Sequence, residues 1–349
     1  MEKLKLGDIC KIVTGSTPKT SIAEYWDGNI NWITPVELTE DTYIVNDSQR
    51  KITNRAIEET GLKSFPKGTV ILTSRAPIGK VAIAGKEMYC NQGFKNLICS
   101  SKINNKYLYW YLKGHTEYLN SLGRGATFKE ISKTIVENIE IPVPDLDTQK
   151  NCVDVLEKCN KIIKSYQKQL KSFDTLVKSR FIELFENKNN CKISNMNDIC
   201  EGILAGGDRP KDTSEIRTKE YPYPVFANAA TNEGLLCFSR NYKIDKPCVT
   251  IAARGCTVGF TAIRNERFTP VVRLISLIPK NEITPMYLKY FIDIKMCIEG
   301  NGAAQPQLTL PMIREMKISV PPLELQNKFA VFVAHVDKSK HFYEMEVAA

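Results

Sequence analysis

The chain has 349 residues, of which 43% are hydrophobic and 25% are charged, and its formal net charge is +9. That length suits two domains of ordinary size, and the composition is typical of a soluble globular protein. No run of 18 apolar residues occurs, and the N-terminus lacks the apolar core of a signal peptide. The sequence therefore argues against a membrane span and predicts a cytoplasmic location. The modest positive charge permits nucleic-acid binding through a local basic face but does not require it.

Residues 1–148 form the first predicted domain, which consists mainly of short strands and turns. Residues 69–73 and 80–84 are rich in β-branched side chains and are bounded by Gly or Pro, which is typical of strands. Residues 105–112 have helical spacing with aromatic side chains on one face. We therefore predict a compact domain with a strand-rich core and a few helices.

Residues 149–188 form a long predicted helix. Apolar side chains recur from Cys152 onward at alternating steps of four and three residues, interrupted only by Arg180. That spacing is the heptad pattern of a coiled-coil seam. Lysines flank the seam, and the helix would be roughly 55–60 Å long. The seam residues expected to contact a second helix are Leu156, Cys159, Ile163, Tyr166, Leu170, Phe173, Val177 and Leu184.

Residues 189–325 form the second predicted domain, which repeats the order of features of the first. Residues 248–252 have the composition of a strand, and residues 283–292 match residues 103–112. Residues 326–349 then begin a second helix, whose seam residues are Phe329, Val333, Val336 and Tyr343. This second helix is shorter than the first, so we expect it to pair with only part of the first seam.

The clearest internal repeat joins each domain to its helix. Residues 141–149 (Ile-Pro-Val-Pro-Asp-Leu-Asp-Thr-Gln) return as residues 318–326 (Ile-Ser-Val-Pro-Pro-Leu-Glu-Leu-Gln), at an offset of 177 residues. Weaker matches keep the same order in both halves, among them residues 74–79 with residues 253–259. A period of this length indicates two domain-sized halves rather than a solenoid. Two similar halves joined by a helix can recognise two similar features of a partner at a fixed separation.

Catalytic chemistry has little support in the sequence. The three histidines, His115, His335 and His341, are too few and too scattered for a catalytic triad or a metal site. The segment that ends at Lys80 lacks the first Gly and the final Ser or Thr of a phosphate-binding loop. No Asn/Asp-Pro-Pro-aromatic methyltransferase motif and no convincing nuclease carboxylate cluster occurs. We therefore expect no catalytic residue, no metal and no cofactor in this chain.

Polar and basic side chains in turns are the candidates for contact with nucleic acid. Residues 15–19 and 207–211 place cations next to turn amides and hydroxyls that suit a phosphate. Arginines and glutamines in other turns suit base edges. Taken singly, each is better explained as a solvent-facing turn residue, but their matched positions in both halves favour the functional interpretation. The candidate DNA-binding residues are Thr17, Lys19, Arg75, Lys80, Gln92, Lys95, Arg124, Thr127, Lys129, Arg209, Lys211, Arg254, Arg264, Gln305 and Gln307.

The order of a variable domain, a Pro-x-Leu-x-x-Gln step and a long helix, repeated once, resembles the specificity (S) subunit of type I restriction-modification systems. Residues 143–149 and 320–326 resemble the family's junction between domain and helix. Residues 75–80 and 91–94 resemble recurrent motifs of its target-recognition domains. The likeness covers nearly the whole chain. The second half departs from it at residues 268–271, Phe-Thr-Pro-Val, where the family pattern has Asn-Gln-Gly-Phe.

The resemblance implies an α+β fold with two strand-rich target-recognition domains, each followed by a long helix, and the two helices pair as an antiparallel coiled coil. It also implies that each domain reads one part of a split double-stranded DNA sequence through the major groove, while the helices measure the unread spacer. The implied partners are two modification (methyltransferase) subunits and the restriction (endonuclease and translocase) subunits. S-adenosylmethionine and ATP would belong to those partners, and the chain itself would not be an enzyme.

Two other functions remain open from the sequence. One is a single-chain nuclease or methyltransferase with duplicated DNA-reading domains, which requires a catalytic motif in the same chain. The other is a coiled-coil scaffold whose globular halves bind protein. A scaffold of that kind should have no affinity for DNA, whereas a DNA reader should lose affinity steeply as the salt concentration rises.

Overall fold

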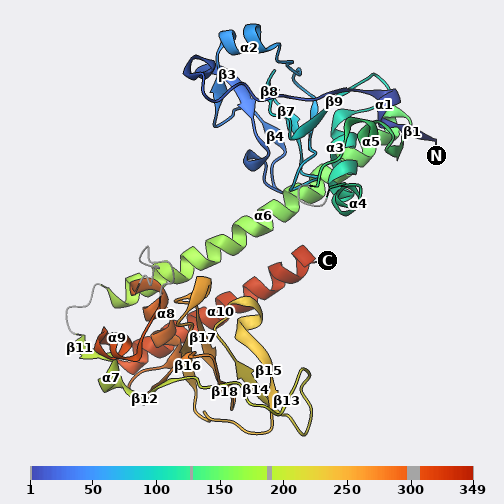
Figure 1. Ribbon diagram of the computed structural model, residues 1–349. Helices are drawn as coiled ribbons and strands as arrows, with labels where there is room; N and C mark the ends of the chain where they lie inside the picture. Colours follow the sequence, from blue (N-terminus) through green and yellow to red (C-terminus); the bar gives the residue numbers. More distant parts are fainter. Residues whose placement is uncertain (1, 126–128, 187–190, 297–306, 349) are drawn as a thin grey trace. The chain divides into compact units, whose positions relative to one another are not determined.

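The computed structural model describes residues 2–125, 129–186, 191–296 and 307–348 (Figure 1). The chain divides into two compact units, Met1–Ile162 and Ile163–Ala349. Each unit contains its own sheets, helices and buried core. Among the described residues, no helix is both long enough and apolar enough to cross a membrane.

The first unit is built around a five-stranded sheet. Four strands pair antiparallel in the order β2-β9-β6-β7, and β4 joins the edge in parallel with β7. Every side chain of β6 and β7 is buried, as expected of short, continuous apolar runs. The strands predicted at residues 69–73 and 80–84 are confirmed. The bounds are β2 Cys10–Val13, β4 Ile44–Val45, β6 Val70–Thr73, β7 Val81–Ala84 and β9 Phe94–Cys99.

Helix α3 (Asn105–Gly114) covers this sheet by packing on β6 and β7, which confirms the helix predicted at residues 105–112. Asn104 caps its start, because the side-chain oxygen accepts the Lys106 N–H at 2.8 Å. The remaining elements form a small sheet β5-β3-β8, a β1-β10 pair and short helices. Their bounds are β1 Lys3–Lys5, β3 Trp26–Ile33, β5 Lys51–Ile52, β8 Tyr89–Cys90, β10 Glu140–Pro142, α1 Leu6–Ile9, α2 Asn54–Thr60, α4 Thr116–Ser121, α5 Lys133–Glu137, η1 Ala23–Tyr25 and η2 Pro35–Glu37.

The second unit repeats this arrangement. Its main sheet has the order β12-β19-β16-β17, its smaller sheet is β13-β15-β14-β18, and β11 pairs with β20. The bounds are β11 Lys192–Asn195, β12 Cys200–Ala205, β13 Thr213–Ser214, β14 Tyr223–Phe226, β15 Leu235–Ser239, β16 Cys248–Ile251, β17 Thr261–Arg264, β18 Thr269–Pro270, β19 Ile275–Pro279 and β20 Lys317–Val320. The helices are α7 Met196–Ile199, α8 Pro285–Lys295, α9 Leu310–Glu315, η3 Thr231–Gly234 and η4 Gly255–Thr257.

The two main sheets have the same strand order, with β2-β9-β6-β7 equivalent to β12-β19-β16-β17. In both smaller sheets one pair is parallel, β3 with β8 and β14 with β18. In both units a short strand next to the following helix pairs with the strand that opens the unit. The internal repeat predicted from the sequence is therefore confirmed, and the α+β fold class with it.

The repeated glutamine at the end of each domain has a structural role that the sequence motif did not reveal. Gln149 is fully buried; its amide donates to Lys102 O at 3.1 Å and Pro144 O at 2.8 Å, and its Oε1 accepts the Asn104 N–H at 2.7 Å. Because every polar atom of the side chain is satisfied, the glutamine fastens the start of the long helix to the loop before α3.

Gln326 makes the same three contacts in the second unit. Its amide donates to Glu282 O at 2.9 Å and Pro321 O at 2.8 Å, and its Oε1 accepts the Thr284 N–H at 2.7 Å. The side chain is fully buried here too. The motif Pro-x-Leu-x-x-Gln, which occurs once in each half, thus joins each long helix to its own domain.

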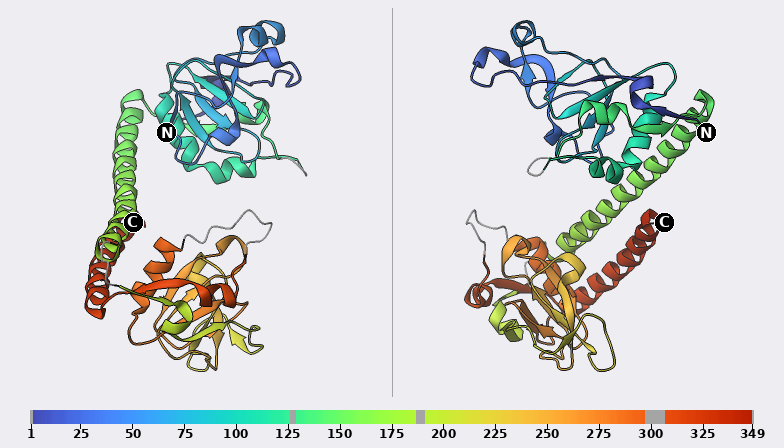
Figure 2. Two further views of the ribbon diagram at one scale, coloured as in Figure 1. Left: turned by 90° about the vertical axis from the view of Figure 1, so that its left-hand side faces the viewer. Right: turned by 45° about the vertical axis from the view of Figure 1, so that its right-hand side comes forward.

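The two long helices are α6 (Leu146–Phe185) and α10 (Leu323–Ala348). Helix α6 begins at residue 146 rather than 149, because the Asp145 carboxylate accepts the Thr148 N–H at 2.8 Å and so caps the helix. Within the second unit α10 runs beside the C-terminal part of α6 (Figure 2). The ring centroids of Phe181 and Phe329 are 5.4 Å apart and those of Tyr166 and Tyr343 are 5.2 Å apart, so the two helices are antiparallel.

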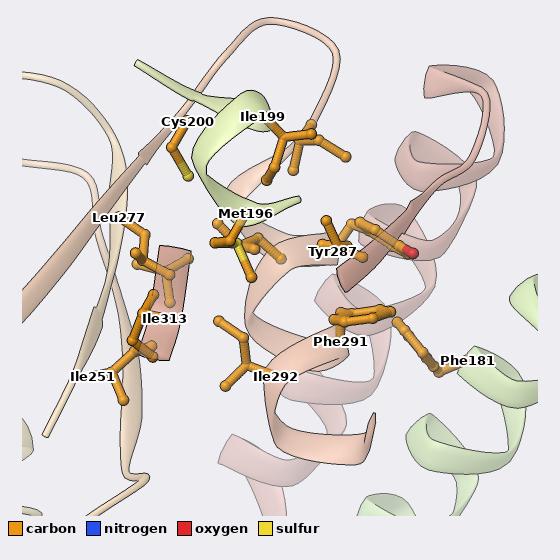
Figure 3. Packing of buried hydrophobic residues seen from close by; sticks show 14 of the residues in the cluster. Phe181, Met196, Ile199, Cys200, Ile251, Leu277, Tyr287, Phe291, Ile292 and Ile313 are labelled. Carbon is orange, nitrogen blue, oxygen red and sulfur yellow. The ribbon is translucent and has the colours of Figure 1, made fainter. Parts of the chain in front are cut away.

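The predicted seam residues differ in burial. Val177, Leu184, Phe329, Val333 and Val336 are buried. Half-buried members are Tyr166, Leu170, Phe173 and Tyr343, while Leu156, Cys159 and Ile163 are exposed. The seam prediction missed Phe181, which is fully buried and stacks on Tyr287 of α8 with ring centroids 5.7 Å apart. Figure 3 shows Phe181 directed toward α8 in the core of the second unit.

Candidate nucleic-acid interface

The polar loops of the first unit gather at one end of its main sheet. The register pairs Val13 with Asn96 and Thr73 with Phe94, so β2 and β6 end where β9 begins. Ile33 is paired with Cys90, which brings the end of β3 to the same place. Residues 14–20, 34–36, 74–80 and 91–93 therefore emerge together. This gathering is a consequence of strand pairing between segments far apart in the sequence.

The loop that begins at Gly15 is packed tightly against the loop at residue 91. A Cβ atom on Gly15 would lie 2.0 Å from Cys90 O, so only glycine fits there. The Thr17 hydroxyl donates to Gln92 Oε1 at 2.6 Å, and both side chains are exposed. Two candidates from different parts of the sequence are thus brought into direct contact, with exposed Lys19 in the same loop.

Aromatic residues that we did not predict hold this loop in place. The indole N–H of Trp32 donates to Ser16 O at 3.1 Å, and that of Trp26 donates to Lys19 O at 3.3 Å. The Arg50 guanidinium lies over the Trp26 ring, 3.8 Å from its centroid. The six-residue spacing of two tryptophans within one strand-like segment places both on one face, and it is the signal that could have identified them.

Arg75, Lys95 and Glu130 form an ion cluster beside these loops. Arg75 Nε lies 2.9 Å from Glu130 Oε2, and Lys95 Nζ lies 3.2 Å from Glu130 Oε1. Partial burial raises the pKa of the Glu130 carboxyl, but the hydrogen bonds from Arg75 and Lys95 lower it, and the net result is a pKa below the usual range. Arg75 is exposed and available to an anion, whereas Lys95 is only 4% exposed.

The ammonium groups of Lys95, which is buried, and Lys80, which is half-buried, are held by contacts within the first unit. Lys95 Nζ also donates to Ser74 Oγ at 3.1 Å, and Lys80 Nζ donates to Leu38 O at 2.7 Å. Both were candidate DNA contacts. Both ammonium groups already donate to partners within the first unit, Lys95 to Ser74 and Glu130 and Lys80 to a backbone carbonyl.

A hollow of about 750 Å³ lies between these loops, lined among others by Arg75, Asn91, Gly93 and Lys129. Exposed Arg124 borders the same region, since its backbone pairs with that of Glu130 at 3.0 Å in both directions. Thr127 lies outside the described residues. The first unit thus presents exposed cations and hydrogen-bonding groups around one concave surface.

The second unit gathers its loops at the equivalent end of its sheet. Ala205 and Ile251 are both paired with Ile275, so β12 and β16 end where β19 begins. Gly206 there repeats the tight contact of Gly15, because a Cβ atom would lie 2.6 Å from Val271 N. Exposed Arg209 and Lys211 follow it in the loop, and Arg209 donates to Thr213 Oγ1 at 3.2 Å.

Arg254 occupies the place that Arg75 has in the first unit. Arg75 forms a backbone bridge with Glu130, and Arg254 forms one with Gln307. Arg254 and Gln307 are both exposed, so two candidates lie side by side. Gln305 lies outside the described residues.

Arg264 does not belong to this surface. It is 4% exposed, its guanidinium lies 3.7 Å from the centroid of the Phe226 ring, and it donates to Thr250 Oγ1 and Glu233 Oε2, each at 3.2 Å. Burial lowers the pKa of this guanidinium. The residues next to Arg264 in the sequence do not show that this side of β17 is covered. The sequence therefore could not distinguish Arg264 from the exposed arginines.

Neither unit shows a metal centre: within the described residues, no three His, Cys, Asp or Glu side chains are grouped so that they could hold an ion. Two domains of one fold, each with loops gathered at one end of its main sheet and each joined to a long helix, define a protein built from a duplicated domain and helix. The family described as "Type I restriction modification DNA specificity domain" matches residues 1–172 and 188–342, and the chain belongs to this family.

Several relatives carry a related description. Over 155 residues the chain is 44% identical to the Type I restriction enzyme MjaIX specificity subunit of Methanocaldococcus jannaschii, covering 44% of this chain and 36% of that protein. It is 23% identical to the Type I restriction enzyme EcoprrI specificity subunit of Escherichia coli, covering 97% of this chain and 88% of that protein. The matched segments span only 36% to 43% of the M. jannaschii protein and of two Mycoplasma pneumoniae relatives.

Solved structures support the fold. The S subunit of a type-I restriction-modification system from M. genitalium has a TM-score of 0.59 at 18% identity, covering 99% of this chain and 92% of that chain. A chain from a structural study of complex assembly in the type I R-M system has a TM-score of 0.63 at 17% identity, covering 99% and 93%. At these identities the likeness concerns the fold alone, and it agrees with the two-domain α+β architecture.

Proposed function

We propose that this chain is the DNA-sequence recognition subunit of a type I restriction-modification complex. It reads a bipartite double-stranded target and directs methylation or cleavage by partner subunits. The observation that carries the proposal is the duplicated set of loops at the same end of each main sheet, with exposed cations at equivalent positions. Membership of the specificity-domain family and the descriptions of the relatives support it.

The proposed contacts are the candidate side chains that reach the surface of these loops. They include both cations able to meet phosphates and polar groups able to meet base edges. In the first unit they are Thr17, Lys19, Arg75, Gln92, Arg124 and Lys129, and in the second unit Arg209, Lys211, Arg254 and Gln307. Lys80, Lys95 and Arg264 are left out because their charged groups are used within the fold.

In this proposal each predicted domain and each predicted helix has its own role. Residues 1–148 and 189–325 are the two target-recognition domains, and residues 149–188 and 326–349 are the spacer helices. The chain itself carries no catalytic step. Two modification subunits supply methyl transfer from S-adenosylmethionine, and restriction subunits supply ATP-dependent cleavage.

Reconstitution with modification subunits, followed by genome-wide mapping of methylated sites, tests this function. The expected result is a bipartite motif with an unread gap. Methylation at one continuous motif, or no methylation at all, would contradict the proposal.

A matched pair of variants makes the test specific to each unit. Arg75→Ala and Arg254→Ala remove equivalent exposed arginines. Each is expected to weaken binding by about 5- to 150-fold if the arginine contacts a base, and to relax only the half of the motif read by its own unit. If both variants relax the same half, the assignment of one half-site to each unit is wrong.

A further inference from the structure

A turn at the loop end of the second unit has a costly backbone conformation. It comprises residues 271–274, directly before β19, and the Leu274 N–H donates to Val271 O at 3.0 Å. Both central residues have positive φ, +51° at Val272 and +59° at Arg273. This is the type I′ arrangement, which pairs such as Asn-Gly normally supply, because L side chains crowd the backbone at positive φ.

The strain is not required by the shared fold. A β-branched residue at positive φ is an outlier, and glycine would avoid most of the cost. The equivalent turn of the first unit, residues 91–94, is described throughout and contains no residue with positive φ. Gln92 and Gly93 correspond there to Val272 and Arg273, because the strands before and after each turn are paired in the same way. The strand pairing thus places residues 271–274, and not residues 268–271 as the sequence pattern indicated, at the position of residues 91–94.

Neighbouring loops hold the turn in this conformation. The Val272 N–H donates to Gly207 O and the Arg273 N–H donates to Gly206 O, both at 2.9 Å. These bonds come from the loop after β12, which carries Arg209 and Lys211. A strained backbone persists only where the surrounding structure determines it in this way.

Asn228 adds a third attachment from the loop after β14. Its side-chain amide donates to Val272 O, and its Oδ1 accepts the Ala253 N–H at 2.9 Å. In the first unit the equivalent N–H, that of Ser74, donates instead to Gly93 O at 2.8 Å. In the second unit a side-chain oxygen, Asn228 Oδ1, therefore takes the place of a backbone oxygen as the acceptor of this N–H. The turn itself has positive φ angles that the first unit lacks.

The side chains of the strained turn face solvent. Val272 is 53% exposed and Arg273 is exposed as well. In the described part of the chain the Arg273 guanidinium forms no hydrogen bond and no ion pair. A Cβ atom on Gly207 would lie 3.3 Å from Lys243 Nζ, so a second cation lies beside the turn. The strain thus holds an apolar and a cationic side chain outside the core, at one defined position.

We propose that Val272 and Arg273 read base edges in the half of the DNA target bound by the second unit, an inference that rests on the proposed function. The Arg273 guanidinium pairs with O6 and N7 of a guanine in the major groove, and the Val272 methyl groups contact a thymine methyl group. Readout of a base depends on the defined position of the side chain. A phosphate contact tolerates a flexible cation and gives no reason to keep the turn at positive φ.

The test uses the full chain bound to its modification subunit and selection from a randomised double-stranded DNA library. The variant V272N/R273G keeps the turn and relieves the strain, so its thermal unfolding midpoint is expected to rise by about 2–4 °C. Its selected sequences should retain the first half-site and lose preference at one or two positions of the second. Binding to the wild-type target should weaken by about 5- to 150-fold.

A second variant separates base readout from charge. Arg273→Lys keeps the charge and the turn but loses the bidentate geometry, so the guanine preference should disappear while the salt dependence of binding is unchanged. Lys280→Ala is the matched control, because it removes a cation at the other end of β19 and should leave the preference intact.

The outcomes distinguish the inference from the proposed function. If wild-type protein selects a bipartite motif and both Arg273 variants select the same second half-site, the inference is overturned and the proposed function stands. If wild-type protein selects no bipartite motif, the proposed function itself fails.

Discussion

Glu130 lies between two cations that come from different parts of the first unit. Arg75 follows β6 and Lys95 belongs to β9, so the carboxylate joins the turn after one strand to the start of another. Lys95 is almost fully buried, and a buried charge is stable only with its partner. The cluster therefore supports both the fold and the position of Arg75 on the proposed DNA surface.

Replacing Glu130 by Gln should destabilise the first unit by about 1–3 kcal/mol, because Lys95 would remain buried beside a neutral amide. Urea unfolding of the full chain measures the loss. Glu117→Gln, at an exposed position of α4, is the control and should change stability by less than about 0.5 kcal/mol. Equal effects of the two substitutions would contradict this role for Glu130.

The same cluster predicts a dependence on pH. The folded-state pKa of Glu130 lies below its ordinary value of 4.5. The stability contributed by the ionised carboxylate is therefore fully present above pH 4.5 and is lost as the pH falls through the lower, folded-state pKa. The difference in unfolding free energy between wild type and Glu130→Gln should shrink toward the acid end of a titration from pH 7 to pH 3. A difference that stays constant over this range would show that ionisation is not its source.

Replacing the buried glutamine at either junction should also lower the stability of the unit that contains it. Gln326→Ala leaves the Thr284 N–H and two carbonyls without partners, at an expected cost of about 2–4 kcal/mol. Gln149→Ala should have a similar effect in the first unit. Gln167→Ala, at an exposed position of α6, provides the control in the same unfolding experiment. If Gln326→Ala were no worse than this control, the junction would not depend on the side chain.

At the scale of elements, α6 changes its character along its length. Near its C-terminus the buried residues are Val177, Phe181, Leu184 and Phe185, which follow the 3.6-residue period of a helix packed on a globular core. A strict heptad seam would select Arg180 instead of Phe181. The two periods drift apart by about 20° per heptad, so the seam prediction and the buried face diverge here.

Phe181→Ala should destabilise the second unit by about 3–5 kcal/mol, because the ring packs against Tyr287, Phe185 and Phe329 in a closed core. Leu176→Ala on the same helix, at a side chain that is 47% exposed, is the matched control and should cost less than about 1 kcal/mol. Both are measured by urea unfolding. Similar losses of unfolding free energy would contradict the assignment of Phe181 to the buried face of α6 and of Leu176 to its exposed face.

At the scale of the whole molecule, α6 is one uninterrupted helix of 40 residues that begins in the first unit and ends in the second. Its contacts with the first unit include Glu157, which accepts the Tyr43 hydroxyl at 2.6 Å. Its aromatic contacts with α10 begin at Tyr166. Residues 159–165, which make up one heptad, lie between these two attachments.

Deleting residues 159–165 should shorten the helix by about 10.5 Å. If the helix measures the unread spacer, the preferred gap in the proposed DNA target should shrink by about 3 base pairs at 3.4 Å each, while both half-site sequences are unchanged. Selection from a library with randomised gap lengths measures this. A substitution of the same seven residues by Ala is the control and should leave the gap unchanged. An unaltered gap in the deletion variant would show that the length of the helix does not set the length of the spacer.

The elements that depend on local pattern could be predicted from the order of the amino acids. Residues 105–112 and 80–84 carried the periodicity and composition of α3 and β7, and these elements are where the pattern predicts them. The duplication was visible because residues 141–149 and 318–326 retain the same junction. Local patterns are sufficient here because helix period, β-branched runs and capping residues act over a few neighbouring positions.

The exposure of the candidate cations could not be predicted in this way, because it depends on how the chain folds. Lys95 and Arg264 could not be told from the exposed cations by their sequence neighbours, yet both are buried. Their charged groups contact residues from other parts of the chain, such as Glu130 for Lys95 and Glu233 for Arg264. The bracing of the Gly15 loop by Trp26 and Trp32, and the strained turn at Val272 and Arg273, were equally hidden. Burial and long-range hydrogen bonds depend on which segments meet in space, and that is settled by packing rather than by the sequence near each residue.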